Sequence, residues 1–106
     1  LDGIVRDRIR MALNGHVVVS VVLDEEDEPI DGAWVDLMGL APTGTSNAPL
    51  AEVLEEDLGQ FLGRAKPKTL TDDDKLEEGL RRVARQSAQN EIGKKPEVTV
   101  VISRLG

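Results

Sequence analysis

The chain has 106 residues, 40% hydrophobic and 31% charged, which is typical of one soluble globular domain. Its formal net charge is −7, and it contains no cysteine and a single histidine, His16. Disulfides, cysteine zinc sites and catalysis by several histidines are therefore excluded within these residues. No apolar run approaches the roughly 20 residues of a membrane span, so we expect no membrane association.

The charges are unevenly distributed along the chain. Residues 1–63 hold 3 basic and 13 acidic side chains, whereas residues 64–106 hold 10 basic and 7 acidic ones. The overall acidity argues against indiscriminate nucleic-acid binding, because phosphates are repelled at long range. The overall acidity does not exclude a basic patch formed by residues of the second half. The absence of cysteine fits a reducing cytoplasm, where we expect the protein.

The first residues are predicted to be a connection rather than part of the domain. The chain begins at Leu1 in the middle of a pattern, so we expect a piece of a longer protein. Residues 1–13 are predicted to form a linker or short helix entering from the missing part. Asn14 and Gly15 then tolerate a sharp turn, and residues 14–106 are predicted to form the domain.

Residues 16–23 give the clearest strand prediction, because five of the eight are valines. The acidic run 24–28 that follows has two interpretations. Clustered carboxylates suit hard metal ions, but a run of like charges is usually an exposed turn, and no glycine stands where a calcium loop needs one. We favour a hairpin turn, with a second strand at about residues 33–40.

Residues 41–49 consist of turn-forming residues and predict a loop. A helix is expected next, with Pro49 in its first turn and Asn47 or a neighbour as its cap. Its apolar side chains recur at helical spacing: Leu50, Val53, Leu54, Leu58, Phe61, Leu62 and Ala65. Pro67 is expected to end this helix.

A second helix is predicted to begin at Thr71, a good N-cap, with residues 72–74 as acids in its first turn. These acids could also be interpreted as a two-metal cluster, but helix capping explains them more simply. The apolar stripe of this helix contains Leu76, Leu80, Val83, Ala84, Ser87 and Ile92. Gly93 and Pro96 predict its end, and residues 98–104 predict a final strand.

The predicted fold class is therefore α/β of the α+β kind, with the order β-β-α-α-β. The simplest packing places two amphipathic helices on one face of a three-stranded sheet. We expect the first strand in the centre, because it is the longest and most apolar.

No catalytic residue and no metal ligand is predicted. His16 has no second histidine or cysteine and no fixed carboxylate spacing around it, so a structural role is favoured. Residues 92–96 partly match a Gly-rich clamp of RNA-binding domains, but Pro96 stands where the second glycine belongs. With Trp34 and Phe61 as the only aromatic residues, base stacking is disfavoured. A weak RNA contact could still come from a basic edge made of Arg81, Arg85, Lys94 and Lys95.

Residues 14–23 (NGHVVVSVVL) and 91–101 (EIGKKPEVTVV) together resemble the opening and closing segments of the C-terminal domain of bacterial ribonuclease J. Residues 31–40 and the spacing of the two helices also match the variant found in proteobacterial members. The resemblance extends from about Arg6 to Leu105 and rests on the order and spacing of these segments, since neither is a catalytic motif.

This resemblance implies a parent several times longer. Its front part would be a metallo-β-lactamase core with an inserted β-CASP domain, carrying a two-zinc site of histidines and aspartates. Family members degrade RNA 5′→3′ and also cut internally, in messenger turnover and ribosomal RNA maturation. None of the family's metal-ligand motifs occurs here. The resemblance thus implies a fragment that is not itself an enzyme and holds no cofactor.

The expected function is that of an accessory domain of a zinc-dependent ribonuclease, serving dimerisation or support of the catalytic body. Its expected partners are its own catalytic domain and a second copy of itself, with RNA as the substrate of the parent. Two alternatives stay open. The domain could feed RNA to the nuclease through its basic edge, or it could dock another protein of RNA decay.

Strand parity predicts where such an interface lies. Residues 17, 19, 21 and 23 of the first strand are all apolar and should face the helices. The opposite face lacks the charges that a solvent face would carry, and an exposed apolar strip usually marks an interface. The candidate interface residues are Val18, Ser20, Val22, Trp34, Thr99, Val101 and Ser103. The alternative is that the linker around residues 4–13 folds over this strip.

Overall fold

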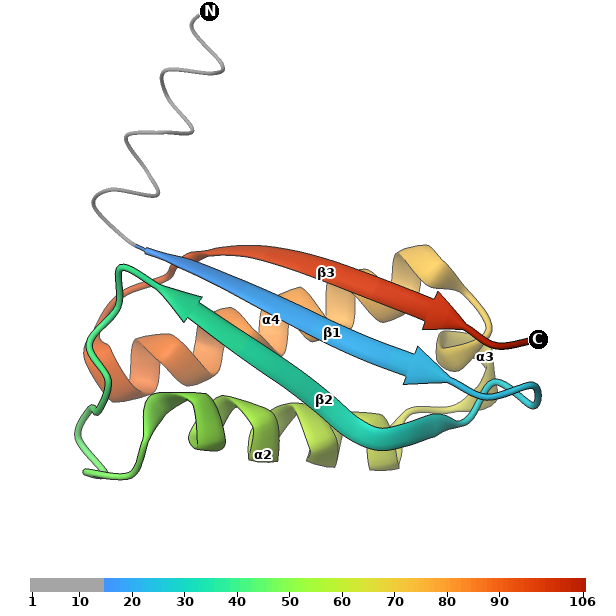
Figure 1. Ribbon diagram of the computed structural model, residues 1–106, viewed down its shortest axis with the longest axis horizontal. Coiled ribbons are helices and arrows are strands. Elements are labelled where there is room, and N and C mark those ends of the chain that lie inside the picture. The colour runs from blue at the N-terminus through green and yellow to red at the C-terminus, as the bar shows by residue number, and fades with distance from the viewer. Residues whose placement is uncertain (1–14) are drawn as a thin grey trace, which may run out of the picture.

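The computed structural model describes residues 15–106 (Figure 1). Its elements are β1 (His16–Leu23), β2 (Pro29–Met38), α2 (Leu50–Arg64), α3 (Pro67–Leu70), α4 (Asp73–Ile92) and β3 (Glu97–Arg104). The predicted β-β-α-α-β order is confirmed, with the short helix α3 added between the two long ones. The linker predicted at residues 1–13, and its alternative role as a cover, lie outside the described residues.

The three strands form one sheet in the order β2-β1-β3, so β1 occupies the predicted central position. β1 pairs with β2 antiparallel through a hairpin and with β3 parallel. Parallel neighbours need a long crossover connection, and the segment containing α2, α3 and α4 supplies it. Both long helices lie on the same side of the sheet, and no helix or strand of residues 15–106 covers the other side (Figure 1).

The core lies between the sheet and the two long helices. On β1 every second side chain is fully buried, as the parity predicts: Val17, Val19, Val21 and Leu23. α2 contributes leucines four residues apart, Leu50, Leu54, Leu58 and Leu62. α4 contributes Leu76, Leu80 and Ala84. Burying each such leucine stabilises the fold by about 1.5–3 kcal/mol, which makes this layer the main source of stability.

β2 differs from its prediction, since it begins four residues earlier, at Pro29. The register with β1 shifts between Val21 and Val22, and the extra residues are absorbed on β2 by Asp31 and Gly32, with φ of 58° and 75°. Such a bulge breaks the alternation that identifies a strand in a sequence. Proline is tolerated at the first position of an edge strand, where its missing N–H costs no ladder bond.

The helix starts also differ from their predictions. Pro49 precedes α2 as its N-cap residue, and Asn47 makes no capping bond to the helix. α4 starts after Asp72, whose carboxylate accepts a hydrogen bond of 3.2 Å from the backbone N–H of Lys75. Thr71 instead closes α3 and donates its hydroxyl to the carbonyl of Pro67 at 2.7 Å. α2 ends at Arg64, shortly before Pro67 as predicted, and Pro67 also starts α3, because proline suits the first helical turn.

The end of α4 follows the prediction and also fixes the preceding loop. Gly93 takes the left-handed conformation with φ of 68°. The carbonyl of Glu91 accepts a 2.9 Å hydrogen bond from the backbone N–H of Thr45, and its carboxylate accepts one of 3.1 Å from the Thr45 hydroxyl. Gly44 lies so close to this helix end that an added Cβ would stand 2.3 Å from the carbonyl oxygen of Glu91.

We predict that Gly44→Ala destabilises the domain, because the loop and the α4 terminus would have to separate. The expected loss is about 1–3 kcal/mol of unfolding free energy, the usual cost of overpacking. Gly59→Ala is the control, since nothing lies within 4 Å of its added Cβ in the middle of α2. This control should gain up to about 1 kcal/mol from helix propensity. Urea unfolding measures both, and a Gly44→Ala variant as stable as the parent sequence would contradict the prediction.

Candidate interaction surfaces

The uncovered side of the sheet, called the outer face below, brings the predicted interface residues together. Its central row runs from Trp34 on β2 through Ser20 on β1 to Val101 on β3, which are paired in register. Val18 is flanked by Asp36 and Thr99 in the next row. Because adjacent strands lie about 4.8 Å apart, Trp34 and Val101 stand about 10 Å apart, with the small Ser20 between them.

The outer face exposes large apolar side chains. Trp34, Met38 and Val101 expose 45%, 52% and 45% of their surface, and Val18 and Val22 are half-buried among them. Thr99 and Ser103 are exposed on the same face of β3. Exposed apolar side chains scattered singly are ordinary, but neighbouring ones on one flat face are typical of contact surfaces.

Sequence reasoning missed two acids on the outer face. Asp36 pairs with Val18, and Glu97 pairs with His16 at the start of β3. The parity of β2 and β3 is the signal that could have found them. Asp36 lies two residues after Trp34, and Glu97 two residues before Thr99, so each shares the outward face of its strand. The imidazole Nε2 of His16 lies 2.7 Å from the Thr99 hydroxyl, a hydrogen bond across the two strands. Asp36 lies between Trp34 and Met38 on β2, and Met38 pairs with His16 at the same end as Glu97, so the outer face carries both apolar and acidic side chains.

A helix side chain forms a hydrogen bond with the backbone of each outer strand. The carboxylate of Glu55 on α2 accepts from the backbone N–H of Val35 at 3.0 Å. The guanidinium of Arg81 on α4 donates to the carbonyl of Val98 at 3.4 Å and forms a 2.6 Å salt bridge with Glu77. Unpaired strand edges invite pairing with another chain, and charged groups at an edge oppose that. The outer face is thus more available for contact than the sheet edges.

A second surface is a groove of about 280 Å³ beside α4, called the basic groove below. It is lined by Glu78, Arg81, Arg82, Arg85, Gln86 and Lys95. Of the basic edge predicted from the sequence, the structure brings Arg81, Arg85 and Lys95 together here, while Lys94 is exposed outside the lining. Arg82 and Gln86 were missed, although both follow from the helical spacing of residues 81–86.

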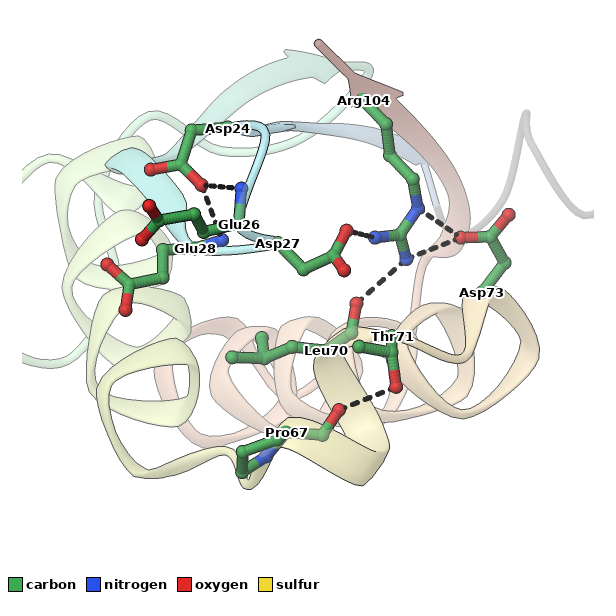
Figure 2. Close-up of polar contacts among 9 residues, drawn as sticks. All are labelled: Asp24, Glu26, Asp27, Glu28, Pro67, Leu70, Thr71, Asp73 and Arg104. Atoms are coloured by element: carbon green, nitrogen blue, oxygen red, sulfur yellow. Dashed lines mark hydrogen bonds and ion pairs between the residues drawn. The ribbon is translucent and has the colours of Figure 1, made fainter. Parts of the chain in front are cut away.

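The third feature is a cluster around Arg104 at the end of β3, shown in Figure 2. Its guanidinium donates to the Asp27 carboxylate at 2.6 Å, to the Asp73 carboxylate at 2.7 Å and to the Leu70 carbonyl at 2.8 Å. These partners belong to the β1–β2 turn, the start of α4 and α3. Asp27 has a φ of 62°, a left-handed conformation that the ion pair helps to hold.

The hydrogen bond to Asp73 and the charges of Asp73 and Asp27 raise the pKa of Arg104 above its ordinary value, although desolvation lowers it. A raised pKa means that the folded state holds this proton more tightly than the unfolded state. The resulting stabilisation is present below the unfolded pKa and would be lost only as the pH rises through the folded value. Arg104 therefore stays charged throughout the pH range in which proteins are studied.

The acidic run 24–28 forms the hairpin turn favoured by its sequence. The carboxylate of Asp24 accepts hydrogen bonds from the backbone N–H groups of Glu26 at 2.8 Å and Glu28 at 3.0 Å (Figure 2). Within residues 15–106, no three acids or histidines gather as a group that could hold a metal ion. None of the helices described is long and apolar enough to cross a membrane.

The chain matches known proteins over almost its whole length. The family described as the ribonuclease J C-terminal domain matches residues 3–105. The chain belongs to the ribonuclease J C-terminal domain family. It is also 33% identical over 102 residues to a ribonuclease J of Sinorhizobium meliloti, which covers 93% of this chain. The resemblance found in the sequence is therefore confirmed.

The same comparison sets the scale of the relative. The chain covers 18% of the length of the Sinorhizobium meliloti ribonuclease J, so most of that protein lies outside the matched part. A ribonuclease J C-terminal domain is thus one segment of a larger protein in this relative. The outer face and the basic groove are the candidate contact surfaces among residues 15–106.

We predict that Arg104→Met destabilises this ribonuclease J C-terminal domain by about 1–2 kcal/mol, because two carboxylates and a carbonyl lose a charged donor. The control is Arg85→Met, an exposed arginine with no salt bridge among residues 15–106. Thermal unfolding at low salt and at 1 M salt measures the stability of both variants. The difference in stability between the two variants should be smaller at 1 M salt. Equal losses in the two variants would contradict the assigned role of Arg104.

Proposed function

We propose that this domain is a non-catalytic accessory domain of a zinc-dependent ribonuclease J. The parent would hydrolyse RNA phosphodiester bonds 5′→3′ and internally, in RNA decay and ribosomal RNA maturation in the cytoplasm. The family match and the relative's name support the ribonuclease. The domain would support the catalytic body and pair with a second copy of itself.

The proposal of self-association rests on the outer face. Trp34, Met38 and Val101 expose apolar surface in a chain whose residues are 31% charged. The small side chain of Ser20 lies between the larger side chains of Trp34 and Val101. Side chains of alternating height suit a face that meets another copy of itself, and isologous pairs are the commonest protein oligomers.

The edges of the sheet favour the same mode of pairing. Glu55 and Arg81 bond to the outer strands, which disfavours growth of the sheet through its edges. Sheets that pack face to face lie about 10 Å apart and bury side chains from both inner faces. We therefore propose packing between two outer faces rather than a continuous six-stranded sheet.

The proposed parent needs zinc, and the residues described here do not fit a zinc site. They include one histidine, no cysteine and no group of three possible ligands. Zinc in proteins prefers nitrogen and sulfur ligands in a tetrahedral set. We therefore derive no catalytic step in this domain, and the hydrolysis belongs to the part of the parent that lies outside this chain.

For self-association, we predict that Val18→Asp combined with Val101→Glu weakens the dimer at least about 30-fold. The reason is that uncompensated charge in an apolar contact costs about 2 kcal/mol or more. Sedimentation of the chain at tens to hundreds of micromolar, before and after the change, measures this.

The matched control for this variant is Gln60→Glu combined with Ala41→Asp. It adds the same two charges at exposed positions on α2 and in the loop before it. Thermal unfolding verifies that each variant is folded. The proposed dimer would be wrong if the unmodified chain stays monomeric at these concentrations and the Val18→Asp, Val101→Glu change leaves assembly of the full ribonuclease untouched.

For the metal, we predict that a chelator leaves the melting temperature of this chain unchanged, because it lacks the ligands for tight zinc binding. Scanning calorimetry with and without EDTA tests this. A drop of several degrees after metal stripping would show a structural metal and refute the prediction.

A further inference from the structure

The basic groove stands out in an acidic chain. Four of its six lining residues are cationic and one, Glu78, is acidic. Arg81 is partly neutralised by Glu77, but Arg82, Arg85 and Lys95 have no salt bridge among residues 15–106. Three unpaired cations at one groove cost free energy through mutual repulsion, which an anion placed among them would relieve.

The groove is also well separated from the acidic hairpin turn. Arg104 ties that turn to Asp73, in the first turn of α4. Arg85 lies twelve residues further along the same helix, which corresponds to about 18 Å. This distance exceeds the Debye length of about 8 Å at physiological ionic strength. The negative charge of the turn is therefore largely screened at the groove.

The lining chemistry fits phosphate better than it fits a protein side chain. Arginine guanidinium groups hold phosphate oxygens in a bidentate fork, and the Gln86 amide adds a neutral donor. The residues that line the basic groove include no apolar or aromatic side chain. Docked peptides usually need such an anchor, whereas backbone contacts to nucleic acid need only cations and donors.

The groove continues in a direction that suits a linear ligand. A second groove of about 300 Å³ between α2 and α4 shares Arg82 and Gln86 with it and adds Arg64 and Gln60. Its lining also includes Val83, Asn90 and Asp57, whose carboxylate accepts a 2.7 Å hydrogen bond from the Ser87 hydroxyl. A chain of phosphates bound at Lys95 and Arg85 can thus pass Arg82 and reach Arg64. Isolated anions would not need this continuation.

We propose that the basic groove binds the phosphodiester backbone of single-stranded RNA through Arg82, Arg85 and Lys95, without reading the bases. This inference rests on the proposed function, because RNA is the substrate of the proposed parent. The domain would then hold a part of the RNA that the catalytic body is not cutting.

The test measures binding of a fluorescent 12-nucleotide oligouridine to this chain across a salt series. Three phosphate contacts to a single strand predict that log K falls against log salt with a slope of about −2. Arg82→Gln with Arg85→Gln should reduce the slope to about −0.7 and weaken binding at least about tenfold in 50 mM salt. A mixed-sequence oligomer should bind within about threefold of oligouridine.

The matched control is Lys68→Gln with Lys75→Gln, which removes the same charge at exposed positions near the other end of α4. The proposal is overturned if the control weakens binding as much as the groove variant. It is also overturned if the bases matter strongly, if no oligonucleotide binds in 50 mM salt, or if a 12-residue polyglutamate binds as tightly. The last result would assign the groove to an acidic protein segment.

Sedimentation keeps this proposal separate from the proposed function. The Arg82→Gln, Arg85→Gln variant should keep the oligomeric state of the unmodified chain, and the Val18→Asp, Val101→Glu variant should keep its salt slope. If the unmodified chain self-associates but binds no RNA, only the groove proposal is overturned. If it binds RNA but stays monomeric, only the outer-face dimer is overturned.

Discussion

The contact between the buried side of β1 and the two long helices is the interaction on which the other features depend. α2 packs against β2, α4 packs against β3, and the helices pack against each other, so β1 lies over the line where they meet. Its Val17, Val19 and Val21 are excluded from water there. Two helices cover one side of a three-stranded sheet and no more, so this contact also creates the outer face (Figure 1).

Charged side chains join segments of the fold that the apolar layer does not hold together. The side chains of Glu55 and Arg81 extend from the helices and form hydrogen bonds with the outer strands. The side chain of Arg104 extends from β3 and joins the hairpin turn to α3 and α4. Each of these groups is fixed in place by the packing below it. Of the cations that line the basic groove, Arg81 has such a structural role, whereas Arg82, Arg85 and Lys95 have no salt bridge among residues 15–106.

Residues whose environment depends on periodicity were predictable, and residues whose environment depends on distant segments were not. The alternation in β1 and the leucines of α2 predicted the layers and the outer face, and the apolar composition of β1 predicted its central position. The bulge at Asp31 hid the start of β2, because it breaks that alternation. Thr71 and Asp72 are equally good caps locally, and the choice depends on Pro67, which starts a helix that periodicity does not show. Asp36 and Arg82 were overlooked, although strand spacing puts Asp36 on the outer face and helical spacing puts Arg82 beside Arg85.

The parallel pairing of β1 with β3 joins residues about 80 positions apart, since His16 stands opposite Glu97. The central strand therefore has one long edge unpaired until residues 97–104 have left the ribosome. Long-range pairing of this kind is slow to form, and apolar surface stays exposed until it has formed. Loss of residues 97–104 would leave β1 open on that side and Asp27 without its arginine. Complete pairing of β1 therefore requires the chain through β3.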